Sequence, residues 1–146
     1  MITGHNHTSI TVSDMDRMLA FYRDIVGMEQ VDVMESKHDK PEATGSGFEG
    51  LHMKIVKLRL DSFVLELVEY VNKKGQKLDT RPTNIGSFHI GFTCDNVRRV
   101  YDDMVAKGIR FKSAPFEWGD ERPSACYGLD PDGNRFEITN DRRFEK

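Results

Sequence analysis

Polar and apolar residues alternate at the start of the chain and then take up a helical spacing. Alternation over residues 7–12 is typical of a half-buried strand. Over residues 14–26 the apolar positions recur at intervals of three and four, which indicates an amphipathic helix. Ser13 or Asp14 is placed to cap this helix, and Gly27 suits the left-handed residue that ends it. The pattern therefore predicts one strand followed by one helix.

The rest of the first half predicts three more strands and one long loop. Residues 28–34 have the pattern of a short strand, whereas residues 35–50 lack apolar periodicity and are rich in charged residues and glycine. A loop of this length is either a lid or binding loop or a solvated, disordered segment, and both interpretations stay open. Residues 51–60 and 63–71 predict two strands joined by a tight turn.

The second half repeats the pattern of the first. His89 follows His7 by 89 − 7 = 82 positions, and Gly108 follows Gly27 by 108 − 27 = 81. The segments predicted here are a strand over 88–94, a helix capped by Asp95, a short strand over 109–112, an irregular loop over 113–123, and a hairpin of strands 124–129 and 134–139. Internal repetition of this kind means that one supersecondary unit is used twice.

Two copies of a β-α-β-β-β module make an α+β fold. We assign residues 1–72 to the first module, 73–86 to a polar connector and 87–146 to the second module, all within one structural domain. A curled sheet of three or four strands with a single helix leaves one face uncovered. We therefore expect the two modules to pair, so that their mixed sheets enclose a cleft.

Composition narrows the class of protein and its partners. The 146 residues include 21 basic and 24 acidic side chains, for a net charge of −3, so no basic surface for nucleic acid is indicated. No signal sequence is recognisable, and no apolar run approaches the roughly 20 residues of a membrane span. Cys94 and Cys126 are too few for a disulfide framework and are expected as small buried residues. We expect a cytoplasmic protein that binds neither nucleic acid nor membranes.

Four side chains occupy matching places in the two halves. His7 and His89 each lie at the head of a first strand, and Glu66 and Glu137 each lie between apolar residues on a last strand. A carboxylate inside an apolar strand needs a cation, hydrogen-bond donors or water, because burying it unpaired is costly. Glu69, nearer the end of its strand, is expected to face solvent. The repeated placement is hard to explain by packing alone, so the four residues form a candidate site.

The chemistry of these four residues fits a metal ion. Two neutral imidazoles and two carboxylates form a dinegative set of nitrogen and oxygen ligands, which suits Zn, Ni, Co, Mn or Fe(II) better than Ca²⁺. An ion with four protein ligands can still accept substrate oxygens and act as a Lewis acid. We therefore expect one divalent transition metal per site, bound by His7, Glu66, His89 and Glu137. For each residue taken singly, a structural hydrogen bond is the alternative.

The irregular loop of the second half supplies a different kind of candidate. Trp118 and Arg122 lie close together in it, and an aromatic side chain beside an arginine can cover a pocket and bind an anionic group. Packing of the loop as a hydrophobic lid on the core is an equally good interpretation. We name Trp118 and Arg122 as substrate-binding candidates.

Several motifs together resemble the vicinal oxygen chelate superfamily. They are residues 7–14 (HTSITVSD), 20–24 (AFYRD), 26–28 (VGM), 89–92 (HIGF) and 130–137 (DPDGNRFE). The resemblance covers nearly the whole chain, and the superfamily includes glyoxalase I, methylmalonyl-CoA epimerase, extradiol dioxygenases, and fosfomycin and bleomycin resistance proteins. It implies that the four residues of the candidate site are the metal ligands of a glyoxalase I-like site, whose substrate chelates the ion through adjacent oxygens.

A metal-dependent isomerase, epimerase or lyase is the function that this resemblance favours. The fourth ligand, Glu66, argues against extradiol dioxygenases, which resemble only the set His7, His89 and Glu137. In glyoxalase I-like sites a ligand carboxylate is also the base, so Glu137 or Glu66 is expected to move a proton between adjacent carbons. The alternatives are an Fe(II)-dependent ring-cleaving dioxygenase and a drug-binding resistance protein that is not an enzyme.

Departures from glyoxalase I bear on the substrate and on the base. Thr11 and Tyr70 stand where the resemblance places an arginine and an asparagine that bind glutathione, so glutathione hemithioacetal is not the expected substrate. An epimerase-like enzyme would use a separate carboxylate, for which Glu42 or Glu49 in the long loop is the candidate. Sites of this family close within one chain or across two, and we expect a homodimer that acts on a small molecule. Candidates for holding an anionic substrate group are Arg59, Arg122 and Arg135.

Overall fold

Two compact units make up the chain, Met1–Lys77 and Leu78–Lys146. The computed structural model describes residues 1–39, 47–117 and 123–142. Each unit runs strand, helix and then further strands, and each has a sheet with both parallel and antiparallel neighbours. The predicted α+β class with mixed sheets is therefore confirmed.

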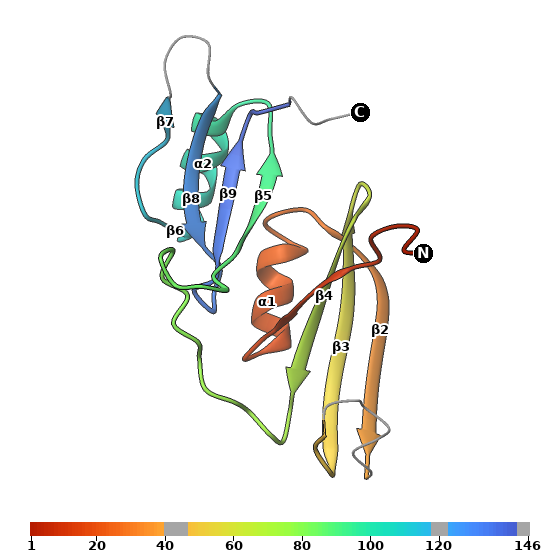
Figure 1. The fold of residues 1–146 in the computed structure, drawn as a ribbon. Coiled ribbons are helices and arrows are strands. Elements are labelled where there is room, and N and C mark those ends of the chain that lie inside the picture. The colour runs from red at the N-terminus through yellow and green to blue at the C-terminus, as the bar shows by residue number, and fades with distance from the viewer. Residues whose placement is uncertain (40–46, 118–122, 143–146) are drawn as a thin grey trace. The chain divides into compact units, whose positions relative to one another are not determined.

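The first unit is a four-stranded sheet with one helix. Its strands lie in the order β1-β4-β3-β2, with β1 parallel to β4 and the other neighbours antiparallel. Its elements are β1 (Thr8–Thr11), α1 (Met15–Tyr22), β2 (Glu29–His38), β3 (Leu51–Leu60) and β4 (Phe63–Tyr70), as Figure 1 shows.

The second unit repeats this plan with one additional short strand. Its strands lie in the order β5-β9-β8-β6, with β5 parallel to β9, and β7 pairs with β8. Its elements are β5 (His89–Thr93), α2 (Val97–Ala106), β6 (Arg110–Phe111), β7 (Phe116–Glu117), β8 (Ser124–Leu129) and β9 (Arg135–Thr139). The strand β7 lies inside the segment that the sequence predicts as an irregular loop, which corrects that prediction.

The strand β2 is longer than its sequence predicts. It continues through four residues of the expected loop and ends at His38, because it pairs with β3 as far as the contact between His38 and Leu51. As the edge strand of its sheet, β2 is exposed along most of its length. An edge strand of this kind needs no apolar alternation, so the pattern from residue 35 onward resembles that of a loop.

The ends of the helices also refine the prediction. Asp14 caps α1 and accepts a hydrogen bond from the N–H of Arg17, whereas α2 is capped by Asn96 and not by Asp95. Asparagine is as good an N-cap as aspartate, so two adjacent candidates cannot be separated by residue type. The helix α1 ends at Tyr22, four residues before the end of the apolar pattern.

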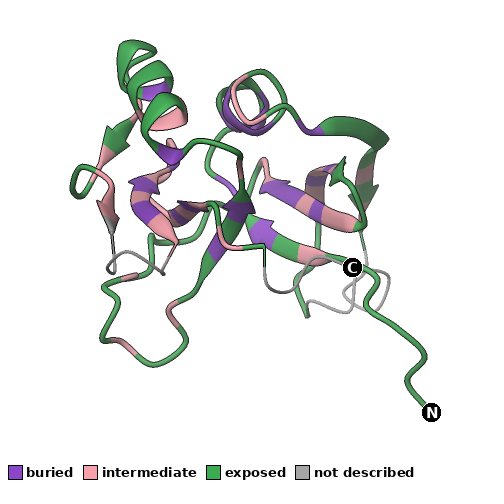
Figure 2. Cartoon of the chain, turned by 90° about the horizontal axis from the view of Figure 1, so that it is seen from above, coloured by how far each residue is buried: buried purple, intermediate pink, exposed green. Residues whose placement is uncertain are grey.

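Each helix covers one face of its own sheet. In the first unit Leu58, Leu65 and Leu67 are fully buried, as are Phe21 and Tyr22 of α1, which contacts β4. Phe21 and Tyr22 are therefore core residues. Residues at the alternate positions of β4, including Glu66, point to the opposite face. Figure 2 shows the resulting bands of buried and less buried residues along the strands.

Glu69 is buried, which corrects the expectation that it faces solvent. It lies on the same side of β4 as Leu65 and Leu67 and has a relative exposure of 8%. Its carboxylate accepts hydrogen bonds from the N–H of Met15 at 3.1 Å and from Lys74 Nζ at 3.2 Å. An anion at the first turn of α1 is stabilised by the unpaired N–H groups there, so the helix provides the partner that the strand pattern does not reveal.

The two cysteines differ in burial. Both are free, and Cys126 is fully buried on β8 whereas Cys94 is half-buried. Burial raises the pKa of the Cys126 thiol to about 11, so the thiol stays protonated at neutral pH. Within the described residues, no helix combines the length and apolar character needed to cross a membrane.

Close packing of β8 against β9 gives the first testable prediction. A Cβ atom added at Gly128 would lie 2.2 Å from the ring of Phe136, which is itself fully buried. We expect Gly128→Ala to lower the free energy of unfolding by about 1–3 kcal/mol, as overpacking does elsewhere. Urea denaturation followed by circular dichroism measures this loss. Gly91→Ala on β5 is the matched control, because nothing lies within 4 Å of the added atom; equal stabilities for the two variants would contradict the prediction.

Candidate metal centre

Parallel pairing of β1 with β4 brings His7 to Glu66. Ser9 lies opposite Glu66 in the register of the two strands, and His7 lies two residues earlier on the same face. The His7 Nε2 atom is 3.5 Å from Glu66 Oε1. The two side chains remain 35% and 15% exposed, so both can be reached from solvent.

The other ring nitrogen of His7 fixes the orientation of the imidazole. His7 Nδ1 lies 2.6 Å from the side-chain oxygen of Asn6, which can only accept, so Nδ1 donates. The lone pair of Nε2 then faces a carboxylate oxygen, and two such electron-pair donors attract only if a cation lies between them. A proton or a metal ion meets that requirement. An oriented second nitrogen is also the usual arrangement for a metal-binding histidine.

The second unit brings His89 to Glu137 in the same register. Gly91 lies opposite Glu137 in the parallel pairing of β5 with β9, and His89 again precedes that position by two residues. The His89 Nε2 atom is 3.1 Å from Glu137 Oε2. The side chains are 37% and 21% exposed. The two units therefore build the same histidine–glutamate pair by the same strand alignment.

Each glutamate also has a neighbour across the antiparallel side of its strand. Lys57 of β3 lies directly opposite Glu66, and its Nζ is 3.8 Å from Glu66 Oε2 and 3.7 Å from Asp32 Oδ2. Tyr127 of β8 occupies the equivalent position opposite Glu137. The two units thus differ here, with a cation beside one carboxylate and a phenol beside the other.

Tyr127 forms a wall of the second pair. Its ring lies edge-to-face against the ring of His89, with centroids 5.5 Å apart, and stacks with Phe116 at 6.2 Å. Partial burial raises the pKa of Tyr127, and the charge of Glu137 and a hydrogen bond to it raise it further. The phenol therefore stays protonated at neutral pH and donates to Glu137.

The separation of the paired atoms fits ligands of a single ion. Two ligand atoms, each roughly 2.1 Å from a metal and at roughly 90–109° to each other, lie about 3.0–3.4 Å apart. The observed distances of 3.5 and 3.1 Å between nitrogen and oxygen agree with that spacing within a few tenths of an ångström. Within the described part of each unit, no third histidine, cysteine, aspartate or glutamate joins the pair. Each pair therefore offers two ligands, fewer than a stable site needs.

Among the described residues, the other candidates from the sequence are not part of these pairs. Trp118, Arg122 and Glu42 lie outside the described residues, and Glu49 is exposed. Arg59 pairs with Glu29 at 3.1 Å, between two well-exposed side chains. Arg135 precedes Glu137 by two residues on β9, and its Nε is buried with no hydrogen-bond partner.

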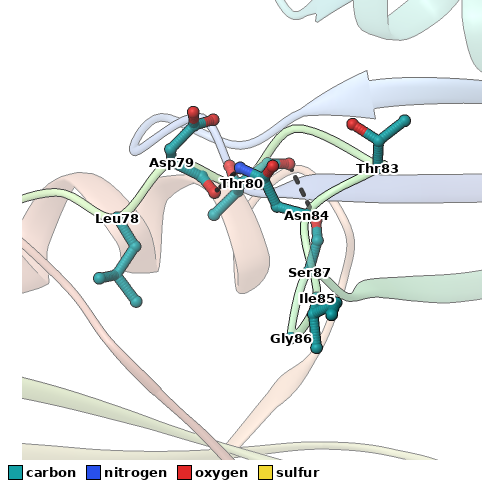
Figure 3. Close-up of a pocket in the computed structure, with 8 residues that line it drawn as sticks. All are labelled: Leu78, Asp79, Thr80, Thr83, Asn84, Ile85, Gly86 and Ser87. Carbon is teal, nitrogen blue, oxygen red and sulfur yellow. Dashed lines mark hydrogen bonds between the residues drawn. The ribbon is translucent and has the colours of Figure 1, made fainter.

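A hollow in the connector of the second unit is a poor metal site. Leu78, Asp79, Thr80, Thr83, Asn84, Ile85, Gly86 and Ser87 line it (Figure 3). Its polar groups largely satisfy one another, since Asn84 donates to the carbonyl of Asp79 and Ser87 to that of Thr80. Its one carboxylate, Asp79, is paired with Arg81 at 2.6 Å. These polar groups are therefore used in hydrogen bonds and an ion pair within the connector.

Lys57 and Tyr127 are the residues near the candidate ligands that sequence reasoning missed. Neither stands out by residue type, because a strand lysine normally faces water and a strand tyrosine normally packs. Once the strands β3, β4, β8 and β9 are aligned, both follow from cross-strand pairing with a glutamate. Lys57 and Tyr127 could therefore have been identified from the register of the two hairpins, but not from the local sequence.

A repeated β-α-β-β-β module with a histidine–glutamate pair in each copy defines a recognisable class of protein. The family model for the Glyoxalase/Bleomycin resistance protein/Dioxygenase superfamily matches residues 4–138. The chain belongs to this superfamily, and the resemblance read from its motifs is confirmed.

Individual relatives and solved structures have low sequence identity to this chain. A lactoylglutathione lyase of Schizosaccharomyces pombe is 29% identical over 148 aligned positions, which cover 92% of this chain and 46% of that protein. The chain thus spans about half the length of this curated relative. A glyoxalase family protein from Bacillus cereus shares the fold with a TM-score of 0.77 at 13% identity, covering 95% and 94% of the two chains. Leishmania major glyoxalase I, described as trypanothione-dependent, has a TM-score of 0.67 at 26% identity, covering 93% and 85%.

Proposed function

We propose that this protein is a metal-dependent lyase or isomerase that acts on a small molecule with two adjacent oxygens. The observation that supports it is the histidine–glutamate pair that each unit builds in the same register and at ligand spacing. A pair supplies two ligands, whereas metal sites in proteins take three or four. His7, Glu66, His89 and Glu137 would therefore hold one divalent transition metal together, within one chain or across a homodimer.

In such a reaction the histidines would bind the metal ion and a glutamate would transfer the proton. The imidazoles of His7 and His89 would hold the ion as neutral ligands, and Asn6 keeps the ring of His7 in the orientation that exposes Nε2. When bound, the ion supplies Lewis-acid chemistry, which makes a C–H next to a substrate carbonyl more acidic. Glu137 or Glu66 accepts that proton and returns it to the neighbouring carbon. Glu137 is the better candidate, because Glu66 faces the charged ammonium of Lys57 whereas Glu137 faces the neutral phenol of Tyr127.

The relatives support this class of reaction and limit the choice of substrate. Lactoylglutathione lyase is the name of the curated relative from Schizosaccharomyces pombe, which supports a lyase. Thr11 is exposed and Tyr70 half-buried at the positions where glutathione contacts were expected, and neither is the expected arginine or asparagine. We therefore propose a substrate other than a glutathione hemithioacetal.

Metal analysis tests the proposal directly. We expect purified protein, after incubation with Ni²⁺, Co²⁺, Zn²⁺ or Mn²⁺ and removal of excess ion, to retain close to one divalent ion per chain. One ion per chain is expected whether the four ligands come from one chain or from two chains of a dimer, so the result does not depend on the oligomeric state. Elemental mass spectrometry measures it. Protein that retains none of the four ions would contradict the proposed function.

A further inference from the structure

Lys57 places a positive charge at the candidate metal centre of the first unit. The two oxygens of Glu66 face different neighbours, since Oε1 lies 3.5 Å from His7 Nε2 and Oε2 lies 3.8 Å from Lys57 Nζ. Lys57 is only 29% exposed, and its strand position fixes its side chain on the face that Glu66 occupies. A cation at Oε1 would therefore have an ammonium group as a close neighbour.

The contacts of Lys57 do not lock it in place. Its Nζ is 3.7 Å from Asp32 and 3.8 Å from Glu66, both beyond hydrogen-bond distance. The pair of Lys74 with Glu69 in the same unit is different, because its 3.2 Å separation is a hydrogen bond. Lys57 thus forms ion pairs with two carboxylates but a hydrogen bond with neither, so its ammonium keeps donors for another anion.

The repeated architecture does not require a lysine here. Tyr127 occupies the equivalent position of the second unit, and its sheet has the same strand order. Glu66 and Asp32 already face this ammonium, but neither lies within hydrogen-bond distance of it, so a substrate anion that reaches both the ion and Lys57 would gain a charge-assisted hydrogen bond. The arrangement therefore favours a ligand with a negative charge next to the oxygens that chelate the ion.

We infer that Lys57 is a specificity-determining residue that binds a carboxylate of the substrate, and that the substrate is a 2-oxo or 2-hydroxy acid. This inference rests on the proposed metal-dependent function. One carboxylate oxygen and the adjacent keto or hydroxyl oxygen would bind the ion, and the remaining carboxylate oxygen would accept a hydrogen bond from Lys57. A neutral substrate with the same two oxygens lacks the second interaction.

Lactate and lactamide test the inference, because they share the carbon skeleton and the adjacent oxygens but differ in charge. Each is titrated into Co²⁺-loaded protein, and binding is followed by the visible absorption of the ion. The ratio of the two affinities is compared between wild type and Lys57→Met. We expect Lys57→Met to reduce the preference for lactate about 10- to 100-fold, as loss of a hydrogen bond to a charged group does. Lactamide affinity should change less than about twofold.

Two further variants separate a charge effect from a structural one. Lys54→Met removes a lysine from the same strand, but three residues away and so on the opposite face, and it should keep the wild-type preference. Lys57→Arg should keep most of it. Should Lys57→Met fail to fold, Lys57→Gln replaces it.

The possible outcomes distinguish this inference from the proposed function. An unchanged ratio in Co²⁺-loaded Lys57→Met overturns the role of Lys57 and leaves the metal site intact. Equal loss in Lys54→Met also overturns it, because the effect would then be one of general charge. Wild-type protein that binds no Co²⁺ contradicts the proposed function itself, and the inference falls with it.

Discussion

Glu137→Gln should lower the rate of proton transfer by about 10²- to 10⁴-fold, the usual contribution of a general base. Glutamine keeps the shape of the side chain and can still contact His89, but its amide does not accept a proton from carbon. Proton–deuterium exchange at the carbon next to the chelating oxygens measures the step directly. It is followed by nuclear magnetic resonance in D₂O, with metal-loaded protein and a panel of 2-hydroxy acids, 2-oxo acids and hemithioacetals.

Glu49→Gln is the control for this experiment. Glu49 is exposed and was the candidate for a separate base in an epimerase-like mechanism, so this variant should exchange at the wild-type rate. If Glu49→Gln lost proton–deuterium exchange and Glu137→Gln kept it, Glu49 would be the base and Glu137 would not. Retention in both, with Glu66→Gln inactive, would assign the proton transfer to Glu66. Metal content measured on each variant ensures that the rates compare loaded proteins.

His7→Ala should cost more than about 100-fold in metal affinity, and His89→Ala should cost as much. Loss of an outer partner of a metal ligand already costs 10–100-fold, and these variants remove a ligand itself. Because the two residues lie in different units, weakening of all Ni²⁺ binding in either variant is expected only if both units contribute to one ion. Isothermal titration with Ni²⁺ measures the affinity and the number of ions bound.

His52→Ala is the matched control for the ligand variants. His52 Nε2 lies 2.5 Å from Glu35 in the first unit, but this histidine–glutamate pair has no equivalent in the second unit. Its removal should leave Ni²⁺ binding unchanged. Two ions per wild-type chain, with one remaining in His7→Ala, would mean that each pair binds its own ion and would disprove a shared site.

The fold was predictable from sequence wherever one face of an element is buried. The strands around Glu66 and Glu137 and the two helices were located because their buried faces impose a period of two or of three to four. The last four residues of the edge strand β2 and the two-residue strand β7 were missed, because each is held by hydrogen bonds to a neighbouring strand rather than by a buried face. Register between strands far apart in sequence leaves no local signal.

The candidate ligands were predictable for a different reason. A duplicated sequence permits comparison of two copies, so His7 with His89 and Glu66 with Glu137 stood out although each residue alone was unremarkable. The same comparison could not find Lys57 or Tyr127, because the two copies differ there. Glu69 was misjudged because its partners, Met15 and Lys74, lie on other elements. Duplication therefore reveals what the halves share and conceals what distinguishes them.

Main-chain pairing sets the spacing of each histidine and glutamate, and this has a consequence for how such a protein can diversify. The alignment of β1 with β4, and of β5 with β9, would persist if the segments joining other strands grew, shrank or changed composition. A shift of one residue between the paired strands would instead turn the glutamate toward the helix. Natural variation should therefore accumulate in the connections, which could change the substrate while the paired histidines and glutamates keep their spacing. Insertions within these four strands should be rare among functional relatives.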